Sequence, residues 1–297
     1  MQKVSKDTVV YAMSAKNAPA LYADPGTKIE FETWDALEGQ IKTQDGAFEG
    51  LDWNRVNPAT GPVYINGAEP GDVLSVKIES ITVASSGVVL AGSGMGVMGQ
   101  KLESSIVRIM PIEGNTARFS DKISLPLNKM IGVIGTAPNE GEIPCGAPDL
   151  HGGNMDCKEI REGATVLLPV NVPGALLAMG DLHAIMADGE IGVTGLEVSG
   201  AVVVTVDVIK GKDLPLPMIL NDEHIMTLAS DEDLDIAVDM AVSNMVEYLT
   251  NNEGFIDHEA VMLISLAADV RICQVVDPKK TIRVEFPRKL LHEGGMK

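Results

Sequence analysis

The stretch HGGNMD, which begins at His151, combines a histidine, an amide and a carboxylate with two glycines. Imidazole and carboxylate groups are common ligands of zinc-like divalent ions, so His151 and Asp156 are candidate metal ligands. Gly152 and Gly153 can adopt positive φ and bring the backbone close to a bound substrate. Their N–H groups, or the Asn154 amide, could hold a polarised carbonyl oxygen. Taken alone, the pattern also fits a tight turn with a surface histidine.

A second polar stretch, GDLHAIMADGE, follows further along the chain. Asp181 and His183 are two residues apart, so on a strand their side chains project from the same face. Two ligand-type side chains on one face, beside a glycine, form half of a metal site. Asp188 and Glu190 share this spacing, and Glu197 lies downstream. The alternative is a hairpin whose polar residues face water, but the flanking apolar runs GALLAM and AVVVTV argue against a purely surface role.

The elements that must position these residues are mostly strands. GDVLSVKIESITV, which starts at Gly71, alternates between polar and apolar residues, and KIEFETWD does the same. Residues 83–103 are rich in Gly and Ser and are expected to form a flexible loop or lid. GMGVMG within them matches GxGxxG, but no βαβ unit surrounds it, so we expect a mobile loop rather than a dinucleotide-binding turn. Residues 126–164 contain many Gly and Pro residues and predict a long irregular stretch, which usually carries function or is disordered.

Helical periodicity appears only near the C-terminal end. Apolar residues follow one helical face from Leu234 to Leu249, after a capping-box-like start formed by Ser230 and Asp233. A second helix is expected to begin at Asp257, and TIRVEF predicts a closing strand. The chain is therefore predicted to be mainly β with two C-terminal helices, because neither half shows regular βαβ alternation.

Composition excludes several classes of protein. The 297 residues include 23 Lys+Arg and 42 Asp+Glu, a net charge of −19, and an acidic surface without a basic stripe repels nucleic acid. No apolar stretch approaches the roughly 20 residues of a membrane span. The cysteines, Cys145, Cys157 and Cys273, form no CxxC pair, which argues against a disulfide framework. The N-terminus lacks an export-signal pattern, so a cytoplasmic location is expected.

Several segments, spread in order over nearly the whole chain, resemble the acetamidase/formamidase family. They are NPATGPVYINGAEPGDVLSVKI, MIGVIGTAP followed by GEIPCGAPDLHGGNMD, GALLAMGDLHAIMADGEIGVTGLEVSG, and LISLAADVRICQVVDPKKTIRVEFP. The resemblance implies hydrolysis of a short amide, such as formamide or acetamide, to a carboxylate and ammonia. One position departs from the family: Ala187 stands where a glycine commonly precedes the Asp-Gly-Glu turn, so the turn need not be identical.

The resemblance also implies an architecture and an assembly. We expect a jelly-roll-like β-sandwich with added α/β elements and two C-terminal helices, in a homodimer or larger homo-oligomer. Residues 1–297 are expected to form a single catalytic unit. Within it, residues 1–125 would form a β-sandwich lobe, and residues 126–297 a lobe of metal-site loops, strands and helices.

The polar residues then predict metal-assisted hydrolysis. The expected ligands of a divalent ion, with zinc as the first choice, are His151, Asp156, Asp181 and His183, with Glu197 as a fifth ligand or as a partner of the others. Such an ion lowers the pKa of bound water toward about 7 and polarises the amide carbonyl. Glu190 would be the general base, and Asn154 or nearby N–H groups, including those of Gly152 and Gly153, would stabilise the oxyanion. Acidic loops could bind calcium at a separate site.

Two alternatives stay open. One is metal-free amide hydrolysis, in which Glu190 and Asp181 activate water or Cys157 is the nucleophile. The other is a non-catalytic β-sandwich module whose acidic loops bind calcium or a small ligand. The combination of histidines with carboxylates argues against this second alternative, because calcium sites use oxygen ligands.

Overall fold

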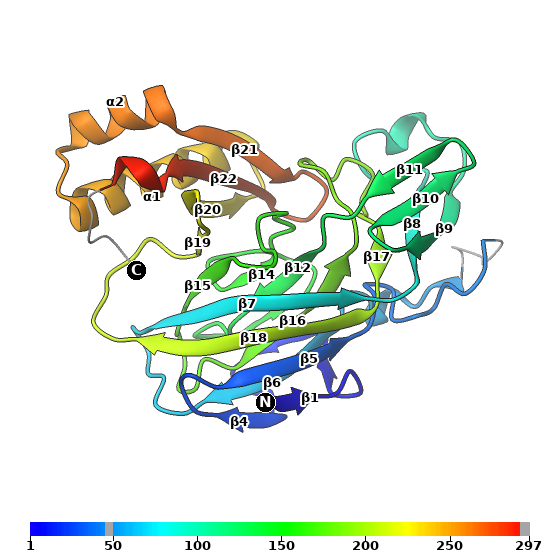
Figure 1. The fold of residues 1–297 in the computed structure, drawn as a ribbon, viewed down its shortest axis with the longest axis horizontal. Helices are drawn as coiled ribbons and strands as arrows, with labels where there is room; N and C mark the ends of the chain where they lie inside the picture. The colour runs from blue at the N-terminus through cyan, green and yellow to red at the C-terminus, as the bar shows by residue number, and fades with distance from the viewer. Residues whose placement is uncertain (45–49, 292–297) are drawn as a thin grey trace.

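Two large, mostly antiparallel sheets form the body of the protein (Figure 1). The computed structural model describes residues 1–44 and 50–291. The first sheet has nine strands in the order β1-β5-β18-β7-β15-β19-β20-β22-β21. These are β1 (Gln2–Val4), β5 (Lys28–Thr33), β18 (Gly200–Ile209), β7 (Val73–Val83), β15 (Thr165–Pro169), β19 (Met218–Leu220), β20 (His224–Asp231), β22 (Lys280–Pro287) and β21 (Asp269–Gln274).

The second sheet has eleven strands, eight of them in the order β11-β10-β9-β8-β17-β16-β12-β14. These are β11 (Ile123–Pro126), β10 (Thr116–Ser120), β9 (Ile106–Glu113), β8 (Ser86–Ala91), β17 (Glu197–Val198), β16 (Leu177–His183), β12 (Met130–Gly135) and β14 (Gly152–Asn154). The other three are β6 (Ala59–Ile65), which pairs with β16, and β2 (Val9–Val10) and β4 (Leu21–Ala23), which both pair with β6. A separate two-stranded sheet joins β3 (Ala12–Ser14) and β13 (Glu142–Pro144).

The main core lies between the two sheets. It combines side chains of the first sheet, such as Ile78 and Val204, with side chains of the second, such as Ile134 and Leu177. Strands from both halves of the chain pair within each sheet, since β7 pairs with β15 and β18, and β6 pairs with β16. The predicted fold class, mainly β with packed sheets and two C-terminal helices, is confirmed.

Two sequence predictions for loops are wrong in part. Within 83–103, β8 is a full strand that pairs with β9, and Gly99–Lys101 form a 3-10 helix, so only part of the stretch is irregular. The stretch 126–164 contains three strands, β12, β13 and β14, and β12 lies between β14 and β16 and is buried along its whole length. A strand that is buried on both faces has a continuous apolar sequence without polar–apolar alternation. The two-residue period that identifies a strand is therefore absent from its sequence.

The two helices cover the β19–β22 end of the first sheet. They are α1 (Leu234–Glu253) and α2 (Asp257–Ala267), as predicted, and they share a second core with β20 and β22 that includes Met245 and Val284. Asp233 caps α1 by accepting hydrogen bonds from the next residues, whereas Ser230 hydrogen-bonds Thr281 on β22 instead of forming the predicted capping box. Among the described residues, no helix is long and apolar enough to cross a membrane.

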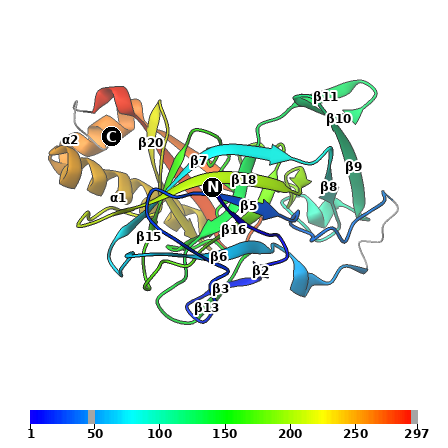
Figure 2. The ribbon, with the colours of Figure 1, turned by 60° about the horizontal axis from the view of Figure 1, so that its bottom comes forward.

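Both views place the helices at one end of the molecule and the strands β9, β10 and β11 at the other (Figures 1 and 2). The two central strands β12 and β16 run side by side in the second sheet, with residues 130–135 opposite 178–183. This pairing matters for function because the predicted polar residues lie at and around β16.

Candidate active site

A buried polar cluster surrounds the last residue of β16. The Nε2 atom of His183 lies 3.1 Å from Glu197 Oε1 and 3.3 Å from Asp181 Oδ1. It also lies 3.8 Å from Asp156 Oδ1 and 3.9 Å from Glu190 Oε1. All five side chains are buried, although carboxylates are almost never buried without a compensating partner. Four carboxylates thus converge on one imidazole nitrogen.

The cluster is assembled from two neighbouring strands and two turns. Asp181 and His183 project from the same side of β16, as their spacing predicts, and Glu197 on β17 is the direct register partner of His183. Asp156 follows β14, which pairs with the other side of β12. Glu190 lies in the turn between β16 and β17.

Three of the four carboxylate residues have a strained backbone. The φ angles are 41° at Asp156, 56° at Asp181 and 42° at Glu190, in the left-handed region that non-glycine residues rarely adopt. Each such residue costs on the order of 1–3 kcal/mol and persists only where the surrounding structure holds it. Strain of this kind is concentrated at functional sites, and here it accompanies carboxylates that face the same imidazole.

Two glycines leave room for the close approach of these side chains. A Cβ atom on Gly132, in β12, would lie 2.4 Å from Asp156 Oδ1 and 2.4 Å from Asp181 Oδ2. A Cβ atom on Gly195 would lie 2.6 Å from His183 Nδ1. Glycine in a strand interior often marks a close approach, and this was the signal in MIGVIG that could have identified Gly132 as a site residue.

Burial and mutual repulsion perturb the charges of the cluster. Burial, reinforced by Asp181, raises the pKa of Asp156 to about 7, and burial also raises the pKa of Glu190 and of Glu197 well above the usual value. Burial opposes a charge on His183, but Glu197 and Asp181 outweigh it and raise the pKa of the imidazole. The cluster therefore has a strong demand for positive charge, which protons or a cation can meet.

The donor atoms fit a divalent cation. Two groups of potential ligands share His183: one adds Asp156 and Glu190, the other adds Asp181 and Glu197, and within each group the ligand atoms lie within 4.8 Å of one another. Ligand atoms about 2.0–2.1 Å from a tetrahedral ion are about 3.3 Å apart. The distances from His183 Nε2 to Glu197 Oε1 and Asp181 Oδ1, 3.1 Å and 3.3 Å, are close to this value. Each carboxylate also has one buried oxygen without a hydrogen-bond partner. Buried polar atoms are nearly always partnered, and these oxygens are available to coordinate a cation.

A cavity of about 120 Å³ opens onto the cluster. Its polar wall contains all five residues together with Asn154 and Asp277, and its apolar wall includes Leu37, Val56, Leu90, Met95 and Val193. Sites for drug-sized ligands span about 300–1,000 Å³, so this cavity is suited to a much smaller molecule.

Comparison with known proteins identifies the family. The model of the acetamidase/formamidase family matches residues 16–145 and 142–292, which together include every residue of the cluster. The chain belongs to the acetamidase/formamidase family. Among solved structures, an acetamidase from Bacillus halodurans is 44% identical, with 97% of each chain covered and a TM-score of 0.95.

Other relatives agree with this assignment. A protein described as a predicted acetamidase/formamidase from Thermoanaerobacter tengcongensis is 45% identical, with 97% of this chain and 96% of that chain covered and a TM-score of 0.95. The curated formamidase of Methylophilus methylotrophus is 25% identical over 85% of this chain and 82% of its own length. The chain spans only 60% and 62% of the length of two further curated relatives.

In this acetamidase/formamidase family member, His151 lies apart from the two ligand groups, although it was predicted as a ligand. Among the described residues it is a member of neither group, and it does not line the cavity. Its ring is buried beside Gly153, both ring nitrogens lack a hydrogen-bond partner, and burial lowers its pKa to about 4. Gly152 and Gly153 have positive φ, as their predicted role requires, but they also lie outside the cavity wall, and the Gly152 N–H donates to the Asp149 carbonyl.

The structure adds Asp277 to the predicted site residues. The Asn154 Nδ2 atom donates to Asp277 Oδ2 over 2.9 Å, and both side chains line the cavity. Burial, followed by the nearby carboxylates of Asp156 and Glu190, raises the pKa of Asp277. Sequence reasoning missed this residue because it lies in a turn after β21, 123 positions from Asn154, with no motif of its own.

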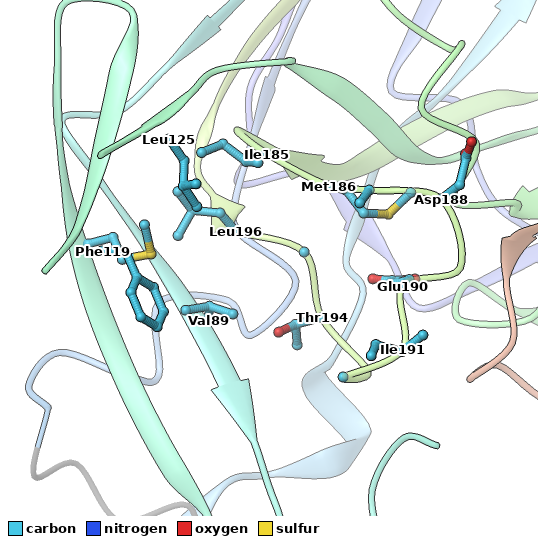
Figure 3. Close-up of a pocket in the computed structure, with 14 residues that line it drawn as sticks. Val89, Phe119, Leu125, Ile185, Met186, Asp188, Glu190, Ile191, Thr194 and Leu196 are labelled. Carbon is cyan, nitrogen blue, oxygen red and sulfur yellow. The ribbon is translucent and has the colours of Figure 1, made fainter. Parts of the chain in front are cut away.

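A larger pocket of about 280 Å³, whose lining residues are drawn in Figure 3, includes residues 190–192 and 194–196 in its wall. Its wall is mainly apolar and includes Val89, Phe119 and Leu125, while Glu190 and Thr194 border both spaces. Asp188 also lines this pocket, but the remaining residues of the cluster do not. Since the converging carboxylates and His183 face the smaller cavity, that cavity is the candidate active site.

Proposed function

We propose that the protein hydrolyses a short aliphatic amide to a carboxylate and ammonia by means of a metal-activated water. The observation that carries the proposal is the convergence of four buried carboxylates on His183 Nε2 at the wall of a small cavity. Family membership supports the amide as substrate, because one similar solved structure is described as an acetamidase and another as a predicted acetamidase/formamidase.

The residues that would hold the ion are His183, Asp181, Asp156 and Glu197. When bound, a divalent ion supplies a water of lowered pKa and polarises the amide carbonyl. Zinc suits a donor set that contains imidazole, whereas a purely oxygen-liganded site would favour calcium. Both ligand groups found among residues 1–44 and 50–291 belong to this one cluster, so a separate calcium site stays a prediction without a located position.

Glu190 is the proposed general base. Its carboxylate lines the cavity, and burial together with Asp156 raises its pKa well above the usual value, which makes it a stronger proton acceptor than an ordinary carboxylate. It would take the proton from water and pass it to the departing ammonia. Hydrolysis requires that second transfer, because an amide ion is too basic to leave unprotonated.

Asn154 is the proposed oxyanion partner. A carboxamide nitrogen carries two hydrogens, and one of them is used by Asp277 Oδ2. The second hydrogen can donate to the oxygen that becomes negative when water attacks the carbonyl, a contribution of roughly 3–4 kcal/mol in comparable sites. Asp277 thereby fixes which end of the amide group is available.

The metal-free alternative with Cys157 as nucleophile has less support. Its thiol is fully buried and does not line the cavity, so it cannot meet an amide bound against His183. The cavity also argues against a binding module without turnover, because it places a raised-pKa carboxyl, an amide group and a candidate ion site around one small space.

The test is ammonia release from formamide, acetamide and propionamide, measured on native, chelator-treated and zinc-reconstituted protein. We expect chelation to abolish release and stoichiometric zinc to restore it. Full activity in a preparation that elemental analysis shows to be free of metal would exclude the metal-activated mechanism. Ammonia release from none of the amides would exclude the substrate class.

We further propose a single catalytic unit over residues 1–297, acting as a cytoplasmic homodimer or larger homo-oligomer. The shared pairing of strands from both halves within each sheet supports the single unit. Light scattering on purified protein tests the assembly: a monomer at micromolar concentration would contradict it. Fractionation of the native host tests the location.

A further inference from the structure

A buried arginine connects the C-terminal strands to the turn that carries Glu190. Arg283 lies on β22 with 1% of its surface exposed. Its Nη1 and Nη2 atoms donate to Asp188 Oδ1 and Oδ2 over 2.6 Å and 2.9 Å, and its Nε atom donates to Glu285 Oε1 over 2.7 Å. A two-pronged contact of this kind fixes the direction of the carboxylate as well as its position.

The backbone of the same turn is attached to the same strands. The Gly189 N–H donates to the Cys273 carbonyl over 2.9 Å, and the Val275 N–H donates to the Gly189 carbonyl over 3.2 Å. Gly189 therefore bridges in parallel to the end of β21. Lys158 adds a partly exposed contact to Asp188 Oδ2 at 2.9 Å. The turn 188–190 is thus held at Asp188 by side-chain contacts and at Gly189 by backbone hydrogen bonds.

Glu190 follows directly, and its carbonyl accepts a hydrogen bond from the Val193 N–H over 3.1 Å. Its backbone is strained at a φ of 42°, and its Oε2 atom has no hydrogen-bond partner. The Glu190 N–H donates a hydrogen bond to the Ala187 carbonyl, with a long N···O distance of 3.3 Å. Asp188 and Glu190 lie on one turn (Figure 3), so a change in the anchor at Asp188 is transmitted over two residues.

We propose that Arg283 is a positioning residue for Glu190, and that it acts through the clamp formed with Asp188. The proposal rests on the proposed role of Glu190 as general base. Arginine rather than lysine is required, because only a planar fork meets both carboxylate oxygens at once while a third donor reaches Glu285. Loss of the clamp releases the strained turn and lets the carboxylate of Glu190 drift from the cavity.

The test compares Arg283→Lys, Asp188→Asn and the double variant with wild type, using ammonia release. We expect each single variant to lose about 100-fold in kcat, the usual cost of a misplacement of about 1 Å, with KM changed less than about threefold. The double variant should be no slower than either single one, because both remove the same clamp.

Arg271→Lys is the matched control. Arg271 is the direct register partner of Arg283 on β21 and also contacts Glu285, but its side chain is half exposed and its second ion pair is with Asp269. We expect its kcat to stay within about twofold of wild type. Equal effects of Arg271→Lys and Arg283→Lys would mean that the loss comes from the strand pair and not from the clamp.

Hydrogen–deuterium exchange of the peptide that spans residues 186–192 provides a readout independent of turnover. In Arg283→Lys and Asp188→Asn this peptide should exchange at least tenfold faster, whereas peptides of β12 and α1 should not change. Asp188→Asn keeps the proposal testable should Arg283→Lys fail to fold. Wild-type exchange and wild-type kcat in both variants overturn the clamp. Absence of amidase activity in wild type would instead overturn the proposed function, while the exchange data would still decide on the clamp.

Discussion

Replacement of Gly132 by alanine tests the geometry of the cluster most directly. The added Cβ atom would lie 2.4 Å from one oxygen of Asp156 and 2.4 Å from one oxygen of Asp181, whereas ordinary van der Waals contact begins at 3.4 Å. Each carboxylate must therefore retreat by 3.4 − 2.4, or about 1 Å. Gly132 does not have positive φ, so the backbone itself accepts alanine, and the effect falls on the two side chains.

A shift of about 1 Å in groups that hold or orient reactants costs about 100-fold in rate. We expect Gly132→Ala to lose at least that factor in kcat for formamide and to bind substoichiometric zinc. Overpacking of this size destabilises a protein by about 1–3 kcal/mol, within the reserve of a folded domain. The measurements are ammonia release, elemental analysis and thermal melting.

Gly192→Ala is the control for this experiment. At that position a Cβ atom would meet only the Leu90 carbonyl, at an ordinary 3.8 Å, so turnover should stay within about threefold of wild type. If Gly132→Ala binds one equivalent of zinc and retains wild-type kcat, then Asp156 and Asp181 do not act where the structure places them, and the proposed ligand set is wrong.

Further predictions address the base, the ligand, the thiol and the charge of the cluster. Glu190→Gln and His183→Ala should each lower kcat by about 10²–10⁴-fold without a change in the circular dichroism spectrum. Cys157→Ala should keep kcat within about threefold, and a thiol-alkylating reagent should not inactivate wild type faster than this variant. In metal-free protein, the pKa of Asp156 is raised from 3.8 to about 7, so between these values the folded state binds more protons than the unfolded chain. The Tm of the metal-free protein should therefore fall as the pH rises from 5 to 7. Zinc should remove that decline, and a Tm that rises over this interval without metal would contradict the assignment.

The parts of the fold that follow a simple period could be predicted from sequence. On β7 the apolar positions Leu74, Val76 and Ile78 are buried and Lys77 is exposed, as alternation requires. Spacing of two likewise placed Asp181 beside His183 even though the left-handed backbone at Asp181 interrupts the regular pleat. The two side chains therefore remain close together despite the distorted backbone at Asp181, because both residues belong to one strand.

Long-range convergence could not be predicted in the same way. His151 and Asp156 lie in one motif, yet only Asp156 reaches the cluster, because positive-φ glycines between them turn the chain. Asp277 reaches the cavity from the C-terminal strands, and the residues next to it in the sequence do not indicate that it accepts a hydrogen bond from Asn154. Such contacts depend on how β21 and β22 dock against the second sheet, which local propensity does not encode.

The features of the site have a common physical requirement. Buried carboxylates repel one another, and burial of each costs several kcal/mol unless a positive charge compensates. The chain adds to this cost with strained backbone at Asp156, Asp181 and Glu190 and with a glycine that brings two of the carboxylates together. The buried Arg283 donates hydrogen bonds to Asp188 and Glu285, which lie outside the cluster. Arg283 therefore does not supply the positive charge that the converging carboxylates require. A bound cation that also takes part in the reaction would supply it.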